Sequence, residues 1–372
     1  MHIHTIAVHA GAETDASTGA LSPPVHLSTT FEHGPAGEEL LGFSYFRDGN
    51  PTQSRLEQAM TQLEGGAAAL VFASGMAAGA AILQSLAPGS HVIFPDFMYA
   101  DFRVLCRQYL PRWGIEASFV EMDKTEEVEA AMRSDTRLVW IESPSNPLLK
   151  ITDIRKVCDI VRSVGAQVLV DNTFATPLLQ RPLELGADIV LHATTKYCGG
   201  HNDVHGGALI LKHNGPLNQT LTEIRRLHGA VASPFASWLV LRGLRSMHCR
   251  MEKHCANATA VAAALSRSEH VDKVYYPGLS SHPGHSIAAM QMKDFGGMLS
   301  FAVKGGYDEA VRVSSRVKLF TNATSLGGTQ SLIEHRASIE GENSKVPINV
   351  LRLSLGLEHP DDLIADLRHA LA

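Results

Sequence analysis

The stretch Ala187-Asp188-Ile189-Val190-Leu191-His192-Ala193-Thr194-Thr195-Lys196-Tyr197-Cys198-Gly199-Gly200 places a lysine just after an apolar run. The run from Ile189 to Leu191 predicts a short buried strand, and the glycine pair ends the segment. Partial burial disfavours the ammonium form, so the amine of Lys196 is expected near neutral, as imine chemistry requires. The alternative is a lysine that only caps the end of a strand.

The chain on both sides of this stretch alternates between strand and helix patterns. Between Ala68 and Leu211, short apolar strands are separated by helical segments, one of them from Phe97 to Tyr109. Near-continuous apolar strands with helices between them predict a mostly parallel sheet covered on both faces. Ligands of such sheets bind beyond the carboxyl ends of the strands. The fold class is therefore α/β.

The pattern changes towards the C-terminus. A long helix is predicted from Phe235 to Leu265, with a break at Arg242-Gly243, and antiparallel strands follow at 298–303 and 350–354. These features predict a smaller α+β unit. We expect three parts: an arm (residues 1–50) that lies on a neighbouring subunit, a large domain (51–245) and a C-terminal domain (246–372).

Composition narrows the functional class. The 372 residues carry a net charge of −6 with 45% hydrophobic and 19% charged residues, which argues against nucleic acid or an anionic membrane as the main partner. No apolar run approaches the ~20 residues of a membrane span. Five cysteines without Cys-x-x-Cys spacing indicate free thiols in a reducing cytoplasm. The 19 histidines are scattered, so no metal site is expected.

Two predicted strand ends carry groups that suit a phosphorylated, cationic ring. Ser74, Gly75 and Met76 open a helix after an apolar strand, where free N–H groups and the helix dipole favour a phosphate. Asp171 follows another buried strand and requires a cationic partner, which a pyridinium nitrogen would supply. The alternatives are a glycine-tolerant helix cap and an aspartate that caps a turn.

Three further residues suit an amino-acid substrate bound beside such a ring. Tyr99 could stack on a flat ring and serve as a base; the alternative is a core aromatic residue. Asn146 between two prolines could bind a phenolate or a carboxylate, or simply form a turn. Arg352 could bind a carboxylate in a bidentate way, or lie on the surface of a strand. Taken together with Lys196, these residues predict a site for pyridoxal phosphate (PLP), bound as a Schiff base.

The motifs now match a known family. The chain resembles the Cys/Met-metabolism PLP-dependent enzymes of fold type I, which include cystathionine γ-synthase, cystathionine γ-lyase and methionine γ-lyase. The resemblance runs from about Thr5 to the C-terminal helix. The segments that carry it are Tyr45-Phe46-Arg47-Asp48-Gly49-Asn50-Pro51-Thr52, Ser74-Gly75-Met76-Ala77-Ala78, Glu142-Ser143-Pro144-Ser145-Asn146-Pro147, Val170-Asp171-Asn172-Thr173-Phe174, Thr195-Lys196-Tyr197, Ser325-Leu326-Gly327-Gly328 and Leu351-Arg352-Leu353-Ser354.

The resemblance implies a role for each site residue. Lys196 would carry PLP, Asp171 would pair with the pyridine nitrogen, and Tyr99 would stack on the ring. The phosphate would be held by Gly75, Met76 and Thr195, and by Tyr45 and Arg47 of a neighbouring subunit. The substrate carboxylate would meet Asn146, Ser325 and Arg352. The resemblance also implies the aspartate-aminotransferase-like fold and a homotetramer, built from two dimers with shared active sites.

Four positions depart from the family pattern. Ala193 stands where a serine is usual, so one phosphate hydrogen bond is lost unless Thr194 compensates. Asp101 stands where a small residue is common, and a carboxylate there would raise the pKa of a nearby tyrosine or favour a substrate with a donor group. Thr324 replaces a glutamate of cystathionine-handling members. The segment 334–341, which contains Arg336, departs from the commoner His-Pro-Ala form.

The resemblance implies γ-replacement or γ-elimination on sulfur amino acids or O-acylhomoserine, as in cystathionine γ-synthase or γ-lyase. Methionine γ-lyase, cystathionine β-lyase and O-acylhomoserine sulfhydrylase remain open, because all use the same groups around the reacting carbon. An aminotransferase is a more distant alternative. A non-catalytic binding module would require a damaged site, whereas Lys196, Asp171 and Arg352 are all present.

Overall fold

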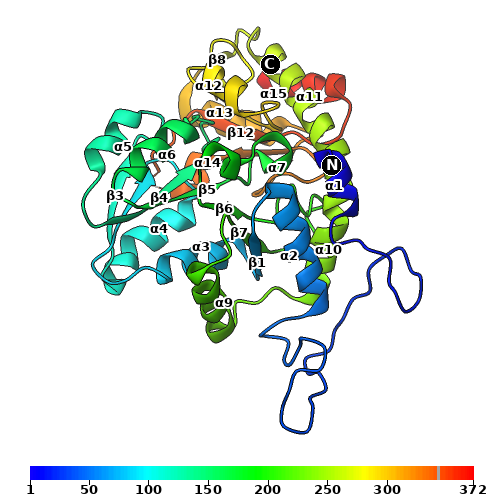
Figure 1. Ribbon diagram of the computed structural model, residues 1–372. Helices are drawn as coiled ribbons and strands as arrows, with labels where there is room; N and C mark the ends of the chain where they lie inside the picture. Colours follow the sequence, from blue (N-terminus) through cyan, green and yellow to red (C-terminus); the bar gives the residue numbers. More distant parts are fainter. Residues whose placement is uncertain (342–343) are drawn as a thin grey trace.

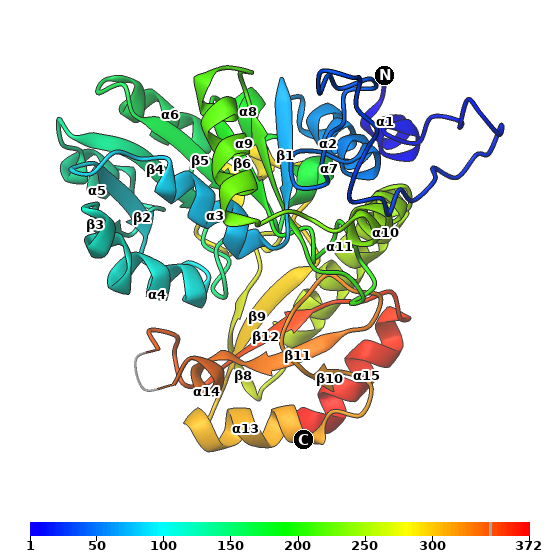
Figure 2. The same cartoon turned by 90° about the horizontal axis from the view of Figure 1, so that it is seen from below.

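The computed structural model describes residues 1–341 and 344–372, whose strands form two sheets (Figures 1 and 2). The larger sheet has the order β1-β7-β6-β5-β4-β2-β3. Strands β2 to β6 all run parallel to one another, whereas β7 runs antiparallel to both of its neighbours, β1 and β6. The bounds are β1 Ala68–Phe72, β2 His91–Pro95, β3 Glu116–Val120, β4 Thr136–Glu142, β5 Gln167–Asp171, β6 Ile189–His192 and β7 Gly207–Leu211.

Helices cover both faces of this sheet, as the apolar strands predict. Alternate residues of β1 point to opposite faces: Leu70 and Phe72 pack with α3, α4 and α9, and Ala69 and Val71 pack with α2 and α10. The helices of this part of the chain are α2 Pro51–Glu64, α3 Gly75–Gln84, α4 Ala100–Gln108, η1 Leu110–Trp113, α5 Thr125–Ala131, α6 Ile154–Arg162, α7 Thr176–Leu179, α8 Pro182–Leu185, α9 Pro216–His228 and α10 Pro234–Leu244.

The smaller sheet has the order β10-β11-β12-β9-β8, antiparallel except for the short β10–β11 pair. Its core is closed by apolar residues of α11, α13 and α15. Figure 2 shows this sheet facing the larger unit. The bounds are α11 Met247–Leu265, β8 Val271–Tyr275, α12 His285–Gln291, β9 Met298–Val303, α13 Gly306–Arg316, β10 Thr321–Asn322, β11 Leu332–His335, α14 Arg336–Glu340, β12 Val350–Ser354 and α15 Pro360–Leu371.

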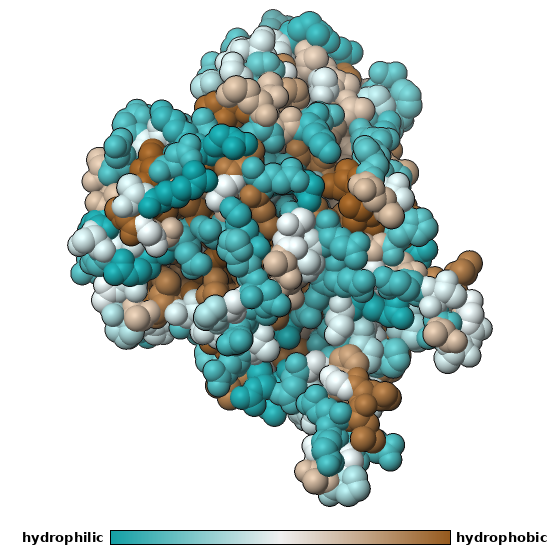
Figure 3. All heavy atoms as spheres, viewed as in Figure 1, coloured by the Kyte–Doolittle hydropathy of each residue, from teal (hydrophilic) through white to brown (hydrophobic). Residues whose placement is uncertain are grey.

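The N-terminal segment, residues 1–50, begins with a short helix that packs on its own chain and continues as a projecting loop. Residues Ile3–His9 form helix α1, whose Ile3 and Ala7 are buried against the body of the chain. The following loop, up to Asn50, projects away from the two sheets (Figures 1 and 2). Hydrophobic atoms are exposed on this projection (Figure 3), among them the side chains of Leu21, Leu27 and Leu41. Apolar groups of this kind are typical of a surface that another chain covers.

Two predicted helix boundaries were wrong. The helix expected from Phe97 begins only at Ala100, which leaves Tyr99 at its N-terminal end. The long C-terminal helix breaks between Leu244 and Met247, not at Arg242-Gly243. Gly243 lies inside α10. A glycine is required at this position because a Cβ would collide with the carbonyl oxygens of Cys198 and Gly199. This glycine allows close packing and does not end the helix.

Candidate active site

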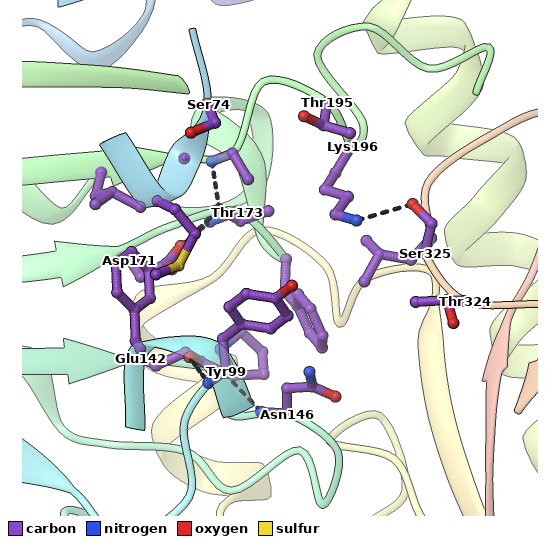
Figure 4. Close-up of a pocket in the computed structure, with 18 of the residues that line it drawn as sticks. Ser74, Tyr99, Glu142, Asn146, Asp171, Thr173, Thr195, Lys196, Thr324 and Ser325 are labelled. Carbon is purple, nitrogen blue, oxygen red and sulfur yellow. Dashed lines mark hydrogen bonds between the residues drawn. The ribbon is translucent and has the colours of Figure 1, made fainter. Parts of the chain in front are cut away.

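A cavity lies where the carboxyl ends of β4, β5 and β6 meet the smaller sheet (Figure 4). Glu142 ends β4, Asp171 ends β5, and Lys196 follows β6 by four residues, so the parallel register brings these chemical groups together. The residues lining the cavity are Ser74, Gly75, Met76, Tyr99, Phe102, Glu142, Pro144, Asn146, Asp171, Thr173, Phe174, Leu191, Ala193, Thr195, Lys196, His205, Thr324, Ser325, Leu326, Arg336 and Arg352.

Lys196 points across the cavity and donates a hydrogen bond from Nζ to the Ser325 Oγ, 2.8 Å away (Figure 4). Burial, and then the positive charge of Arg352, lowers the pKa of this amine to about 8. A substantial fraction is therefore neutral and nucleophilic near physiological pH. Ser325 itself has a φ of +96°, a backbone conformation that costs a non-glycine residue about 1–3 kcal/mol. The hydrogen bond from Lys196 and another to the Ser325 carbonyl hold it there.

Two carboxylates lie side by side at the opposite end of the cavity. Glu142 and Asp171 are register partners on β4 and β5. Glu142 accepts backbone N–H groups of Tyr99 and Asn146, at 2.9 and 2.8 Å, and Asp171 accepts the N–H and hydroxyl of Thr173. Burial raises the pKa of both carboxyl groups, and the charge of Asp171 adds to the effect on Glu142. All these partners are neutral, so the pair suits an added cation.

The first turn of α3 supplies the predicted anion site. Ser74 caps the helix by accepting the N–H of Ala77, and Gly75 and Met76, which line the cavity, lie in the first turn, where backbone N–H groups have no partner within the helix. A Cβ at Gly75 would lie 3.0 Å from the Ala193 Cβ, so the glycine allows the end of β6 to approach. The hydroxyl of Thr195 donates to the carbonyl and accepts the N–H of Gly206.

Arg352 hydrogen-bonds to both of the other predicted carboxylate-binding residues, Asn146 and Ser325. Its Nη1 donates to the Asn146 Oδ1 and its Nη2 to the carbonyl of Ser325, both at 3.0 Å. Nη2 also lies 2.6 Å from the Glu334 Oε2, across the β11–β12 pair. Only 4% of Arg352 is exposed, so a surface arginine on a strand is excluded. Burial lowers the pKa of this guanidinium to about 10, which leaves it charged at neutral pH.

Tyr99 lies at the cavity with its backbone fixed by Glu142 and its hydroxyl donated to the Asp101 Oδ2, 2.8 Å away. The pKa of the phenol is raised to about 12, first by burial and then by Asp101. The predicted direction of the Asp101 effect is correct, although burial is the larger cause. The phenol is therefore protonated near neutral pH, a state in which it acts as a hydrogen-bond donor and not as a base.

Comparison with known proteins agrees with this geometry. The sequence model of the family described as "Cys/Met metabolism PLP-dependent enzyme" matches residues 4–372. The chain belongs to this family.

Relatives within this Cys/Met family carry several activities in their names. The chain is 45% identical to the cystathionine gamma-synthase of Mycobacterium leprae, over 99% of this chain and 96% of that protein. It is 44% identical to the cystathionine beta-lyase of Coxiella burnetii, over 100% of this chain and 98% of that protein. The structure also matches a solved structure of the cystathionine gamma synthase of Xanthomonas oryzae pv. oryzae in complex with aminoacrylate and cysteine. The TM-score is 0.96 and the sequence identity 39%, over 100% of this chain and 98% of that chain. The fold is the type I PLP fold.

The residues present fit PLP, the cofactor of the family. Glu142 and Asp171, which have only neutral partners, would meet the pyridinium, and the cradle at Gly75 and Met76 would meet the phosphate. Lys196 lines the same cavity and offers an amine whose pKa is lowered to about 8. The expected compensation by Thr194 has no support, because this buried residue is absent from the cavity lining of the described chain. Ala193 lies against Gly75 there instead.

Two predicted residues of this Cys/Met family member lie outside its own cavity. Tyr45 and Arg47 are in the projecting loop, where the Arg47 guanidinium packs over the Tyr45 ring with 5.2 Å between Cζ and the ring centroid. Tyr45 is 42% exposed. Their predicted contact with a phosphate of another subunit stays a prediction.

Other site residues were not assigned from the sequence. Glu142 could have been found by the argument used for Asp171, because it too is an acid at the end of a buried strand. Thr173 could have been found from its place two residues after Asp171, a common spacing for a side-chain contact. Arg336 gave no such signal, because its approach to the cavity depends on how the smaller sheet docks.

No described helix has the length and apolar content required to cross a bilayer. Residues 1–341 and 344–372 contain no cluster of three or more His, Cys, Asp or Glu residues arranged for a metal ion.

Proposed function

We propose that the protein catalyses PLP-dependent γ-replacement or γ-elimination on sulfur amino acids or O-acylhomoserine, with cystathionine γ-synthase chemistry as the leading candidate. The observation that carries the proposal is the convergence of a near-neutral amine, Lys196, with a carboxylate-binding group on Arg352, Asn146 and Ser325 in one cavity. The mycobacterial and Xanthomonas relatives favour the synthase branch. The Coxiella relative makes β-elimination the second candidate.

The residues divide the chemical work. Arg352 and Asn146 would hold the α-carboxylate of the amino acid and so fix which bond at Cα faces Lys196. Lys196, neutral in part, would take the Cα proton and then a Cβ proton, and the electron pair left at Cβ would expel the group on Cγ. The protonated Tyr99 hydroxyl would donate to the group that leaves. PLP, held by Lys196, Asp171 and the Gly75 cradle, supplies the electron sink.

A substrate panel tests the reaction. The purified holoenzyme is incubated with cystathionine, with methionine, and with O-succinylhomoserine plus cysteine. Formation of cystathionine identifies γ-replacement, and formation of 2-oxobutyrate identifies γ-elimination. Pyruvate as the only product would refute the γ assignment and favour the β-lyase. Transfer of the amino group without its release would identify an aminotransferase.

We further propose that the active site is shared with a second copy of the chain, within a homotetramer located in the cytoplasm. The support is the projecting loop, which exposes apolar side chains and carries Tyr45 and Arg47 away from their own cavity. The five cysteines, none of which forms a disulfide in the described chain, suit a reducing compartment.

Mixed dimers test the shared site. Arg47→Ala and Lys196→Ala should each lose most activity alone. When the two variants are unfolded and refolded together, hybrid dimers contain one site with both native residues, so activity should return. Mixtures that stay as inactive as the separate variants would refute a shared site. Arg245→Ala, which changes a residue outside the loop and the cavity, serves as the control in place of Arg47→Ala.

A further inference from the structure

Five buried or half-buried charged side chains form a continuous chain from the cavity to the larger domain. Arg352 contacts Glu334 at 2.6 Å, Glu334 contacts Arg336 at 3.1 Å, Arg336 contacts Glu340 at 3.0 Å, and Glu340 contacts Arg103 at 2.8 Å. Positive and negative charges alternate, and both ends are arginines. Three guanidinium groups therefore face two carboxylates, which leaves one positive charge in excess.

The central contact is a single oxygen shared by two arginines. The Oε2 of Glu334 lies against both the Arg352 Nη2 and the Arg336 Nη1. Side-chain exposure is 4% for each arginine and 2% for Glu334, so water does little to screen these charges. If Glu334 paired with Arg352 alone, the two would form a neutral pair, and Arg352 would attract an incoming carboxylate weakly.

Arg336 brings a second positive charge to Glu334. It lines the same cavity as Arg352, and its Nε has no hydrogen-bond partner in the part of the chain that the structure describes. Its two terminal nitrogens are held by Glu334 and Glu340. Glu340 is in turn anchored by Arg103 of helix α4. The guanidinium is thus fixed at the same Glu334 oxygen that Arg352 contacts.

We propose that Arg336 is a positioning residue that shares the charge of Glu334, so that Arg352 stays net positive towards the α-carboxylate of the substrate. This inference rests on the proposed function only in taking an amino acid as the ligand. Removing the charge of Arg336 leaves two cations and two anions in the chain. Arg352 then keeps its geometry but loses most of its excess charge.

The experiment compares two ligands that differ by one carboxylate. Glycine and methylamine are titrated separately into the holoenzyme, and the change in the visible absorbance band reports binding of each amine. Arg336→Gln should weaken glycine binding by at least about tenfold, because one charge lost at an effective dielectric constant near 20 changes binding by about tenfold at roughly 12 Å and by more at shorter distances. Methylamine binding should not change. Arg267→Gln, at an exposed arginine of the smaller domain, is the matched control and should alter neither titration.

Two further variants separate charge sharing from a merely structural role. Arg336→Lys keeps the charge and should retain most glycine affinity. Glu334→Gln introduced into the Arg336→Gln protein removes the anion that neutralises Arg352, so glycine binding should recover. If Arg336 only supported the local packing, the double variant would be as weak as the single variant or weaker. That outcome would overturn the proposal, as would equal weakening of glycine and methylamine.

The failure of the proposed function would look different. A wild-type protein that bound glycine no better than methylamine would have no carboxylate site, and both the amino-acid chemistry and the role of Arg336 would be refuted. A wild-type protein that prefers glycine but fails the sulfur-substrate panel would refute the transsulfuration assignment alone. The effect of Arg336→Gln on glycine would remain in that case.

Discussion

The two sides of the cavity handle charge in opposite ways. On the large-sheet side, Glu142 and Asp171 are buried next to each other with only neutral hydrogen-bond donors around them. On the small-sheet side, Arg352 already contacts Glu334, which Arg336 shares. The first side has no cationic hydrogen-bond partner of its own, and the pyridinium of PLP would supply a cation there. The second side compensates all but one of its positive charges, so its affinity for a carboxylate depends on where that excess charge lies.

Breaking the large-sheet side at its lysine should have the largest effect. Lys196→Ala removes the amine that we propose both holds PLP and acts as the base at Cα, so turnover should fall by at least about a thousandfold. The visible absorbance of the holoenzyme should be lost too. Because the Lys196 side chain lines the cavity, where its Nζ donates to the Ser325 Oγ, the variant should still fold. Activity is measured with the best substrate of the panel, and folding by circular dichroism.

The exposed Lys304 provides the control for this change. Lys304→Ala should retain full turnover and the absorbance band. A Lys196→Ala protein that kept its visible band would show that another amine carries the cofactor.

Breaking the small-sheet side should leave the cofactor in place. Arg352→Lys keeps a positive charge but loses the planar pair of donors that now reach Asn146 and Ser325. We expect kcat/KM to fall roughly a hundredfold, mainly through KM, because at least two charge-assisted hydrogen bonds are lost. The visible absorbance spectrum should not change. Loss of PLP from this variant would show that the two sides are not independent, contrary to the comparison.

The lowered pKa of Lys196 should be visible in the PLP-free protein. Its folded pKa of about 8 lies below the ordinary lysine value of 10.5, so the amine loses its proton as the pH rises through 8. Acylation of Lys196 should therefore accelerate roughly tenfold between about pH 7 and about pH 9 and then level off. Peptide mapping by mass spectrometry measures the rate at this site and at the exposed Lys304. A rate at Lys196 that rises as steeply above about pH 9 as below it would contradict the burial argument.

The same comparison explains how much the sequence alone can predict. Asp171 and Lys196 each follow an apolar run, and parallel strands align such ends whatever the loops do, so their convergence follows from local pattern. Arg352 was picked by residue type and family motif. Its contact with Glu334, however, requires the register of β11 on β12. Arg336 approaches the cavity only because the whole smaller sheet docks there. Helix propensity misplaced the break near Gly243, because the sequence does not show that the backbone of Cys198 packs against this glycine.

The smallest expected effect concerns Asp101, which lies beside the cavity and acts on it through Tyr99. Asp101→Asn keeps a group of similar size but removes the negative charge that opposes ionisation of the phenol. The pKa of Tyr99 should fall below 12 but stay above 10, because burial, the larger cause of the shift, is unchanged. The ultraviolet difference spectrum of phenolate, recorded against pH, measures it. Subtracting the titration of the Asp101→Asn/Tyr99→Phe protein isolates this tyrosine from the others.

Activity in Asp101→Asn should change only a few-fold at neutral pH, because the phenol is protonated in both proteins. The alkaline limb of the pH–rate profile should move to lower pH if the protonated phenol donates to the leaving group. An unchanged alkaline limb, together with a lowered pKa of Tyr99, would remove Tyr99 from proton transfer. Its part on the large-sheet side would then be limited to packing against the ring, a role that Tyr99→Phe would preserve and Tyr99→Ala would not.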